Sequence, residues 1–318
     1  MDVVLAVAAV IAGLYFLEAA AERFVDAIGG LSRRLRASEG AVGLLTAGGE
    51  WEELVVVVFA IISGHPGLAV GNVIGSCLAN LIGSMPLGLL AKRPLAPDRS
   101  ARVYGVFLIA VTILVILLSL SGRVTPLGGG VLVLAFAAYV LSVLFIIWRG
   151  WLKTPPTEAA SLAAAPERPS LVLLVSLGIS LAIICGAAEA VVLGASHIAR
   201  VVGLSEYAIG ATIVAIGTTL PDKAISLVAG RAGQGGVVTS NALGSNIFLL
   251  TLVLGVAALA SAPGLQVPTV VRQVDLPLLL AVSAIVALLL RRSRLHWRVG
   301  LALLAAYGAY LAFALIRG

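Results

Sequence analysis

Long apolar segments follow one another along the chain, separated by short polar stretches. A helix needs about 20 mostly apolar residues to cross a bilayer, and most of these segments are about that long. Within each segment the apolar residues are consecutive rather than alternating, which favours helices over the strands of a closed barrel. The pattern predicts ten spanning helices, at 3–22, 42–63, 68–90, 103–120, 127–148, 171–198, 207–229, 237–262, 276–290 and 299–316.

The stretch 151–169 is rich in Pro, Ala and Glu and has the composition of a linker. It separates residues 1–150 from residues 170–318, and each part holds five of the predicted spans. Because five is odd, the second part must enter the membrane in the opposite direction to the first. The expected fold is all-α, with ten transmembrane helices arranged as two inverted five-helix repeats.

Composition agrees with a membrane protein and excludes several other classes. Of the 318 residues, 60% are hydrophobic and 11% are charged, and the mean hydropathy is +1.12. A soluble domain carries about 25% charged residues. These values exclude a cytosolic enzyme, a nucleic-acid-binding module and a disordered chain. The expected surroundings are a lipid bilayer, and we predict no nucleic-acid partner and no obligate protein partner.

The basic residues predict the orientation in the membrane. Most of the 21 Lys and Arg residues fall in the loops on one side of the ten predicted spans, and this side includes the linker. Since cytoplasmic loops carry the excess of Lys and Arg, we expect a cytoplasmic linker, both termini outside and residence in the plasma (inner) membrane. The start of the chain lacks the basic segment of a signal peptide, so the first span is expected to be retained.

An internal repeat relates the two halves. Six small or polar residues of the first half recur in the second half in the same order and at the same spacing; they are Gly48, Gly64, Gly67, Asn72, Gly75 and Ser76, matched by Gly217, Gly233, Gly236, Asn241, Gly244 and Ser245. The two copies lie at about 40–90 and 207–256. Inverted repeats with interrupted helices are typical of secondary transporters, whose substrate sites lie near the middle of the membrane.

Carboxylates gather at the repeated motif. Of the 15 acidic residues, Glu50, Glu52, Glu53 and Asp222 lie in predicted spans, each shortly after a Gly-containing break. Ionisable residues inside a membrane are costly and usually functional. Carboxylate, hydroxyl, amide and carbonyl oxygens together favour a hard cation, and the lack of His and Cys at the motif centre disfavours zinc or copper. We therefore predict an oxygen-lined cation site.

The second copy resembles the α-repeat of the cation/Ca²⁺ exchanger superfamily. The similar residues are Gly217-Thr218-Thr219-Leu220-Pro221-Asp222 and Asn241-Ala242-Leu243-Gly244-Ser245-Asn246, and the first copy is similar to a lesser degree. The resemblance implies ten helices, with a central site formed by helices two, three, seven and eight. It also implies antiport of Ca²⁺ against Na⁺ or H⁺ by alternating access, while helices one and six slide across the rest.

The resemblance also implies a set of ligands. The acidic ligands fall on Glu53 and Asp222, and the amide falls on Asn80. The hydroxyl ligands fall on Ser76, Thr218, Thr219 and Ser245, and carbonyl ligands on Ala47 and Ala215. No cofactor is implied, because the bound ions are the transported ones.

The chain departs from the family pattern at six positions. Gly49 and Glu50 replace two hydroxyl residues, Glu52 replaces a proline, and Asp222 replaces a longer glutamate. Leu249 stands where an acidic or amide residue is expected, and Lys223 adds a cation directly after Asp222. The ion stoichiometry or selectivity could therefore have changed, and sodium sites in particular are in question.

Each of the added charges has two interpretations. Glu50 is either a ligand or proton carrier, or a water-facing charge at a helix break. We expect Glu52 to pair with Lys223. Lys223 is interpreted as a built-in counter-ion, whereas the alternative makes Lys223, Glu53 and Asp222 a structural ion-paired set.

Other polar residues also have a structural alternative. Ser76, Asn80, Asn241 and Ser245 could simply hold helices together through hydrogen bonds. His65 is expected to be an exposed turn residue.

The functional alternatives are an exchanger for Mg²⁺ or Mn²⁺ and a passive cation channel. A membrane-embedded enzyme is disfavoured, since the three His residues are scattered along the chain and supply no nucleophile–base pair.

Overall fold

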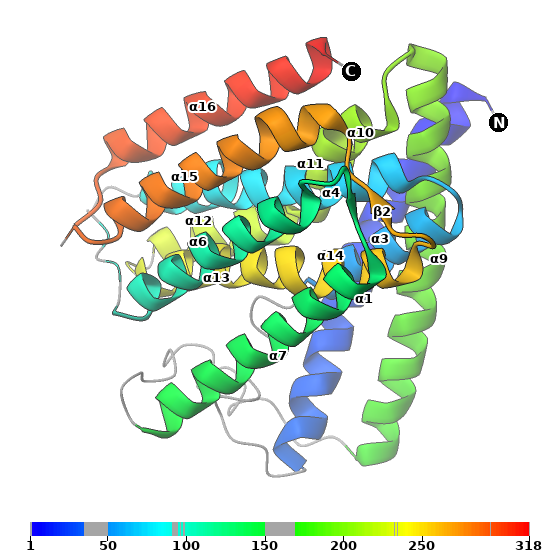
Figure 1. The fold of residues 1–318 in the computed structure, drawn as a ribbon. Helices are drawn as coiled ribbons and strands as arrows, with labels where there is room; N and C mark the ends of the chain where they lie inside the picture. The colour runs from blue at the N-terminus through cyan, green and yellow to red at the C-terminus, as the bar shows by residue number, and fades with distance from the viewer. Residues whose placement is uncertain are drawn as a thin grey trace.

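The computed structural model describes residues 2–34, 50–90, 99–149, 169–231, 235–292 and 294–317, together with residues 95, 97 and 233. Almost all of them are helical (Figure 1). The first half contains α1 (Val3–Arg34), α3 (Trp51–Ile62), α4 (Pro66–Leu78), the π-helix η1 (Ala79–Ser84), α5 (Met85–Leu89), α6 (Arg99–Ser119) and α7 (Pro126–Trp148).

The second half begins after the linker, which lies outside the described residues. Its helices are α9 (Ser170–Val202), α10 (Glu206–Ile209), η2 (Gly210–Val214), α11 (Ala215–Thr218), α12 (Leu220–Arg231), α13 (Gly235–Phe248), η3 (Leu249–Val253), α14 (Leu254–Ala260), η4 (Val271–Asp275), α15 (Leu276–Leu289) and α16 (Trp297–Ile316). Two short strands, β1 (Arg123–Val124) and β2 (Leu265–Gln266), pair antiparallel and connect the two halves.

Within the described residues, eight helices are long and apolar enough to cross a membrane. The other two predicted spans are the second and the seventh. Only the later part of the second, α3, is described, because residues 42–49 lie outside the described ranges. The seventh is interrupted between α11 and α12, which divides it into two short helices. The first span differs too, because α1 continues to Arg34 beyond its apolar segment.

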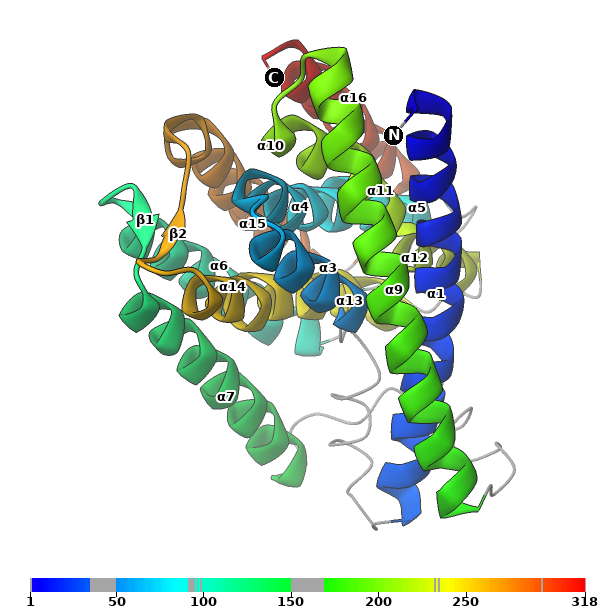
Figure 2. The same cartoon turned by 90° about the vertical axis from the view of Figure 1, so that its right-hand side faces the viewer.

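The two longest helices, α1 and α9, lie side by side along one flank and run antiparallel (Figures 1 and 2). Glycines allow this close approach. A Cβ on Gly13 would lie 2.7 Å from Val191 Cγ2, and a Cβ on Gly194 would lie 2.7 Å from Val10 Cγ2. The reciprocal contacts and the antiparallel course fit two halves of opposite orientation. Both chain termini lie on the same side of the molecule (Figures 1 and 2).

The centre of the molecule is formed where the third span crosses the seventh. Here Gly75 packs on Ala211, and Gly210 packs on Leu68: a Cβ on Gly75 would lie 2.5 Å from Ala211 O, and one on Gly210 would lie 2.4 Å from Leu68 O. Any larger side chain would force these helices apart, so the glycines of the repeated motif permit backbone contact. This crossing holds the interrupted helices of both halves next to each other.

Candidate cation-binding site

The third, seventh and eighth spans each change from α-helix to π-helix and back, at η1, η2 and η3. Single π turns inside α-helices are rare and often occur at functional sites. Asn80 lies in η1, and Leu249, at the repeat-related position, begins η3. The two halves therefore share this irregularity even where the residue type has changed.

The two repeats touch each other directly at this point. Asn246 Nδ2 donates a hydrogen bond to the carbonyl oxygen of Cys77 at 2.9 Å. Cys77 and Asn246 occupy equivalent positions in the two copies of the motif. Equivalent residues can meet only near the axis that relates the two halves, so the pseudo-twofold axis passes close to this contact.

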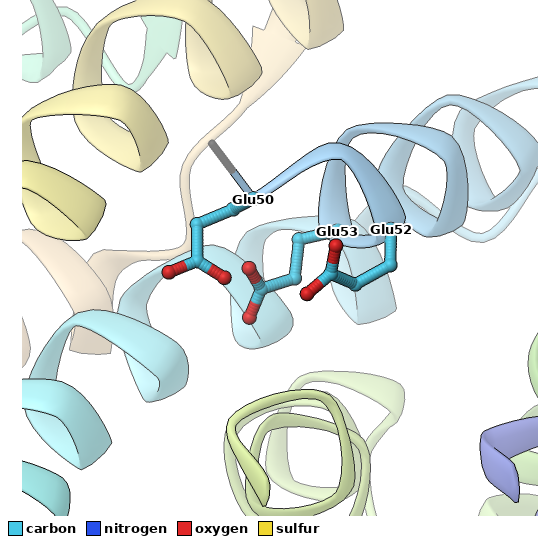
Figure 3. A group of neighbouring side chains, drawn as sticks. All are labelled: Glu50, Glu52 and Glu53. Atoms are coloured by element: carbon cyan, nitrogen blue, oxygen red, sulfur yellow. The ribbon is translucent and has the colours of Figure 1, made fainter. Parts of the chain in front are cut away.

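Three glutamates form a buried cluster at the start of α3 (Figure 3). One carboxylate oxygen from each of Glu50, Glu52 and Glu53 lies within 4.8 Å of the others. Their exposed fractions are 3%, 8% and 0%. Glu50 is the N-cap residue of α3, and the partial positive charge of a helix N-terminus favours negative groups there. The three side chains project in the same general direction from the helix start.

Three of the six carboxylate oxygens in this cluster lack a hydrogen-bond donor among the described residues. Both oxygens of Glu53 and Oε1 of Glu50 have no partner among the described residues. A buried ionised carboxylate is very unfavourable unless it is paired, binds a cation or takes up a proton. The cluster is therefore suited to binding positive charge.

Asp222 brings the carboxylate of the second half to the same place. It lies in the first turn of α12, directly after the interruption of the seventh span, and is 6% exposed. Its carboxylate lies near that of Glu50 and within electrostatic range of that of Glu53. Asn241 Nδ2 donates a hydrogen bond to Asp222 Oδ1 at 2.7 Å. Asn241 is not among the ligands predicted from the sequence, although its place in the repeated motif sets it apart.

Hydroxyl and amide groups surround the carboxylates. Thr218 Oγ1 lies 3.5 Å from Ser76 Oγ and joins the two halves. Ser245 is buried, faces Glu50, and its hydroxyl has no hydrogen-bond partner among the described residues. Asn80 Oδ1 accepts from Ser84 Oγ at 3.5 Å, and its Nδ2 group has no partner in the same part of the chain. The structure thus brings Ser76, Thr218 and Ser245 close to the carboxylates of both halves.

Lys223 makes different contacts from those expected. Its ammonium group donates to Thr219 Oγ1, to the Thr219 carbonyl at 3.2 Å and to the Ile216 carbonyl at 3.4 Å. The predicted pair with Glu52 is not among the ion pairs of the described residues. Glu52 instead belongs to the acidic cluster. Lys223 binds the hydroxyl and carbonyl oxygens at the interruption between α11 and α12.

Only one of the two candidate carbonyl ligands lies in the described part of the chain. The Ala215 carbonyl already accepts a hydrogen bond from Thr219 Oγ1 at 2.6 Å. Ala47 lies outside the described residues.

The expectation that His65 is an exposed turn residue is wrong. His65 is the N-cap residue of α4, and its Nδ1 lies 2.6 Å from Glu206 Oε1 at the start of α10. The His65 side chain is only 17% exposed. Sequence reasoning missed this pair, because the partners are far apart along the chain and meet only when the third and seventh spans cross.

Comparison with known proteins identifies the family. The family model described as "Sodium/calcium exchanger protein" matches residues 5–145 and 172–316. The chain belongs to the sodium/calcium exchanger family. It is 31% identical over 262 residues to the putative antiporter CaxA of Alkalimonas amylolytica, with 80% of each chain covered. It is 30% identical over 317 residues to the inner membrane protein YrbG of Escherichia coli K12, covering 97% of this chain and 96% of that one.

Solved structures of the sodium-calcium exchanger NCX_Mj have a similar fold. One of them matches 98% of this chain and 99% of its own, with 26% sequence identity and a TM-score of 0.65. The resemblance to the exchanger superfamily and the all-α membrane fold with two repeats are thus confirmed. Members of the sodium/calcium exchanger family are integral membrane transporters of cations rather than enzymes, and their transport uses no cofactor.

Proposed function

We propose that this member of the sodium/calcium exchanger family is a secondary antiporter that exchanges Ca²⁺ against Na⁺ or H⁺. The observation that carries the proposal is the meeting of buried carboxylates from both repeats, Glu53 and Glu50 from α3 and Asp222 from α12. Carboxylate, hydroxyl and amide oxygens match the preference of Ca²⁺ for several hard oxygen ligands. The name of the structurally similar sodium-calcium exchanger supports the same substrate, and that of the putative antiporter CaxA supports antiport.

The proposed ligands come from four spans of the two halves. They are Glu50, Glu53, Ser76, Asn80, Thr218, Asp222 and Ser245. Thr219, which was also a predicted ligand, contacts the ammonium group of Lys223 instead. Glu52 and Lys223 modify the charge of the site without binding the transported ion. Antiport follows from shared ligands, since carboxylates that hold Ca²⁺ must be neutralised by another cation when the empty site is reoriented. Na⁺ and H⁺ both meet that requirement.

We further propose the arrangement of the chain in the membrane. Both termini face outside, the linker at 151–169 is cytoplasmic, and residues 1–150 and 170–318 form the two repeats, with α-repeats at about 40–90 and 207–256. The location of both termini on one side supports an even number of spans (Figure 1), and the excess of Lys and Arg in the loops on the other side supports an outer location for the termini. The membrane is the plasma (inner) membrane, in keeping with a relative named as an inner membrane protein.

Uptake of ⁴⁵Ca²⁺ into proteoliposomes tests the proposal. The purified protein is reconstituted, and uptake is compared under an outward Na⁺ gradient, an outward H⁺ gradient and no gradient. Glu53→Gln and Asp222→Asn remove the central charges, and Glu189→Gln is the matched control because Glu189 is exposed on α9. Gradient-driven uptake that is weakened in both central variants and unchanged in the control supports antiport and identifies the driving ion.

Other results would contradict the proposal in distinct ways. Uptake that needs no gradient indicates a channel. Uptake blocked by a small excess of Mg²⁺ or Mn²⁺, and replaced by transport of that ion, indicates a different divalent substrate. No uptake by folded protein contradicts Ca²⁺ exchange.

A further inference from the structure

The ammonium group of Lys223 has the surroundings of a bound cation. Its three contacts are all to oxygens: Thr219 Oγ1 and the carbonyls of Thr219 and Ile216. An ammonium carries three donors, so these three contacts satisfy it. The oxygens lie at the carboxyl end of the helical segment Glu206–Thr218, where the seventh span is interrupted. Carbonyls at the ends of interrupted helices are the groups that coordinate Na⁺ in many transporters.

The neighbouring residues Thr218 and Thr219 therefore have different roles. Thr219 Oγ1 donates its hydrogen to the Ala215 carbonyl and accepts from Lys223. Thr218 Oγ1 instead bonds the Val214 carbonyl at 3.2 Å and lies 3.5 Å from Ser76 Oγ of the other half. Thr218 therefore lines the shared site, whereas Thr219 holds the lysine.

The charge of Lys223 also acts on the carboxylates of the site. The ammonium is close enough to Asp222, Glu53 and Glu50 to interact with each of them electrostatically. In the first repeat, the equivalent position is Leu54, which is apolar. Among the described residues, Lys223 of the second half is therefore a fixed cation beside a set of four buried carboxylates, and the equivalent position of the first half carries no charge.

We propose that Lys223 is a tethered cation, which permanently occupies one monovalent cation position of the exchanger. The proposal rests on the proposed antiport function. Because this positive charge travels with the protein, the site needs one fewer monovalent cation for each Ca²⁺ than the same site without the lysine. Thr219 is then a positioning residue for the ammonium and does not bind a transported ion.

The coupling ratio tests the proposal in proteoliposomes. Opposing Ca²⁺ and driving-ion gradients are varied at clamped membrane potential until net ⁴⁵Ca²⁺ flux is zero, which yields the number of driving ions per Ca²⁺. Lys223→Met is expected to raise this number by one, whereas Lys223→Arg leaves it at the wild-type value. Arg231→Met is the matched control, since Arg231 is an exposed basic residue at the end of the same helix.

A second readout needs no transport. In detergent without Ca²⁺, the melting temperature is followed as NaCl or KCl replaces choline chloride at constant ionic strength. Lys223→Met is expected to gain a saturable stabilisation by one of these ions that wild type and Arg231→Met lack. Lys223→Gln, which keeps hydrogen-bond donors but loses the charge, should behave in the same way and serves if the methionine variant does not fold.

The outcomes separate this proposal from the proposed function. An unchanged coupling ratio in the charge-free variants, without new stabilisation by a monovalent cation, overturns the tethered cation. If the wild-type protein moves no Ca²⁺, the proposed antiport fails, and the melting experiment still decides whether Lys223 fills a cation position.

Discussion

The two repeats supply their carboxylates to the site in opposite ways. In the first half, the oxygens of Glu53 lack hydrogen-bond partners among the described residues, and the next residue, Leu54, is uncharged. In the second half, Asp222 accepts a hydrogen bond from Asn241 and is followed by Lys223. The two halves share a fold, but within the described residues the Glu53 carboxylate lacks hydrogen-bond donors, whereas the Asp222 carboxylate is already stabilised.

The repeated asparagines show the same difference. Asn241 bonds the carboxylate of its own half at 2.7 Å, whereas both side-chain polar atoms of the buried Asn72 lack partners among the described residues. Equivalent positions in a repeat therefore do not have equivalent contacts. We infer that the first half provides most of the charge that exchanges ions and the second half most of the rigid support.

The largest effect is expected for Glu53→Gln. This substitution removes the unpartnered charge at the centre, and since each 1.4 kcal/mol is a factor of ten, a loss of about 3 kcal/mol of Ca²⁺ binding lowers affinity by about 100-fold. ⁴⁵Ca²⁺ uptake as a function of Ca²⁺ concentration measures it, with Glu189→Gln as control. Uptake at wild-type affinity would remove Glu53 from the site.

Asp222→Asn is expected to have a smaller effect, because Asn241 and Lys223 already stabilise this position. We expect about a tenfold loss of Ca²⁺ affinity, equivalent to about 1.4 kcal/mol. The same uptake assay, run in parallel with Glu53→Gln, ranks the two. A loss for Asp222→Asn that exceeds that of Glu53→Gln would reverse the proposed roles of the halves.

Glu50→Gln is expected to weaken Ca²⁺ binding by about fivefold, or about 1 kcal/mol. Glu50 adds charge to the cluster, but Glu53 and Asp222 remain when it is neutralised. Equilibrium ⁴⁵Ca²⁺ binding to the purified protein in detergent measures this affinity. An effect as large as that of Glu53→Gln would make Glu50 a central ligand, and no effect would make it a water-facing charge at the helix start.

The smallest and most specific test compares two equivalent asparagines. Asn241→Ala deletes a hydrogen bond to a carboxylate, an interaction of about 1.5–3 kcal/mol, and part of this loss should appear as about a threefold weaker Ca²⁺ affinity. Asn72→Ala deletes no such bond, so its Ca²⁺ affinity should stay close to wild type. Equal losses in the two variants would show that the halves support their carboxylates in the same way.

Much of the architecture could be predicted from the sequence. Apolar segments of bilayer length and the repeat of small residues are local properties, and both led to an all-α membrane protein with two repeats and to its family. The positions of Glu50, Glu53 and Asp222 in the repeated motif also indicated which carboxylates to consider, because charge inside an apolar segment is itself an unusual signal.

The contacts of the polar residues were harder to predict. The direction of Glu52, turned away from the neighbouring carboxylates on a helix, favoured a pair with Lys223, but the ammonium binds oxygens at the helix interruption. His65 and Glu206 are 141 residues apart, and nothing local marks them as partners. A hydrogen bond depends on distances of a few tenths of an ångström, and such distances are set by how spans cross.

The sequence by itself determined the number and kind of apolar segments, the duplication and the kind of ion that oxygen-rich residues favour. The tertiary structure decided which of those oxygens line the shared site and which already bind a cation. Thr218 lies beside Ser76 of the other half, whereas Thr219 accepts a hydrogen bond from Lys223. The physical reason is that hydrophobicity and residue type are properties of each position, whereas hydrogen bonding and charge balance in a buried site depend on every helix that meets there.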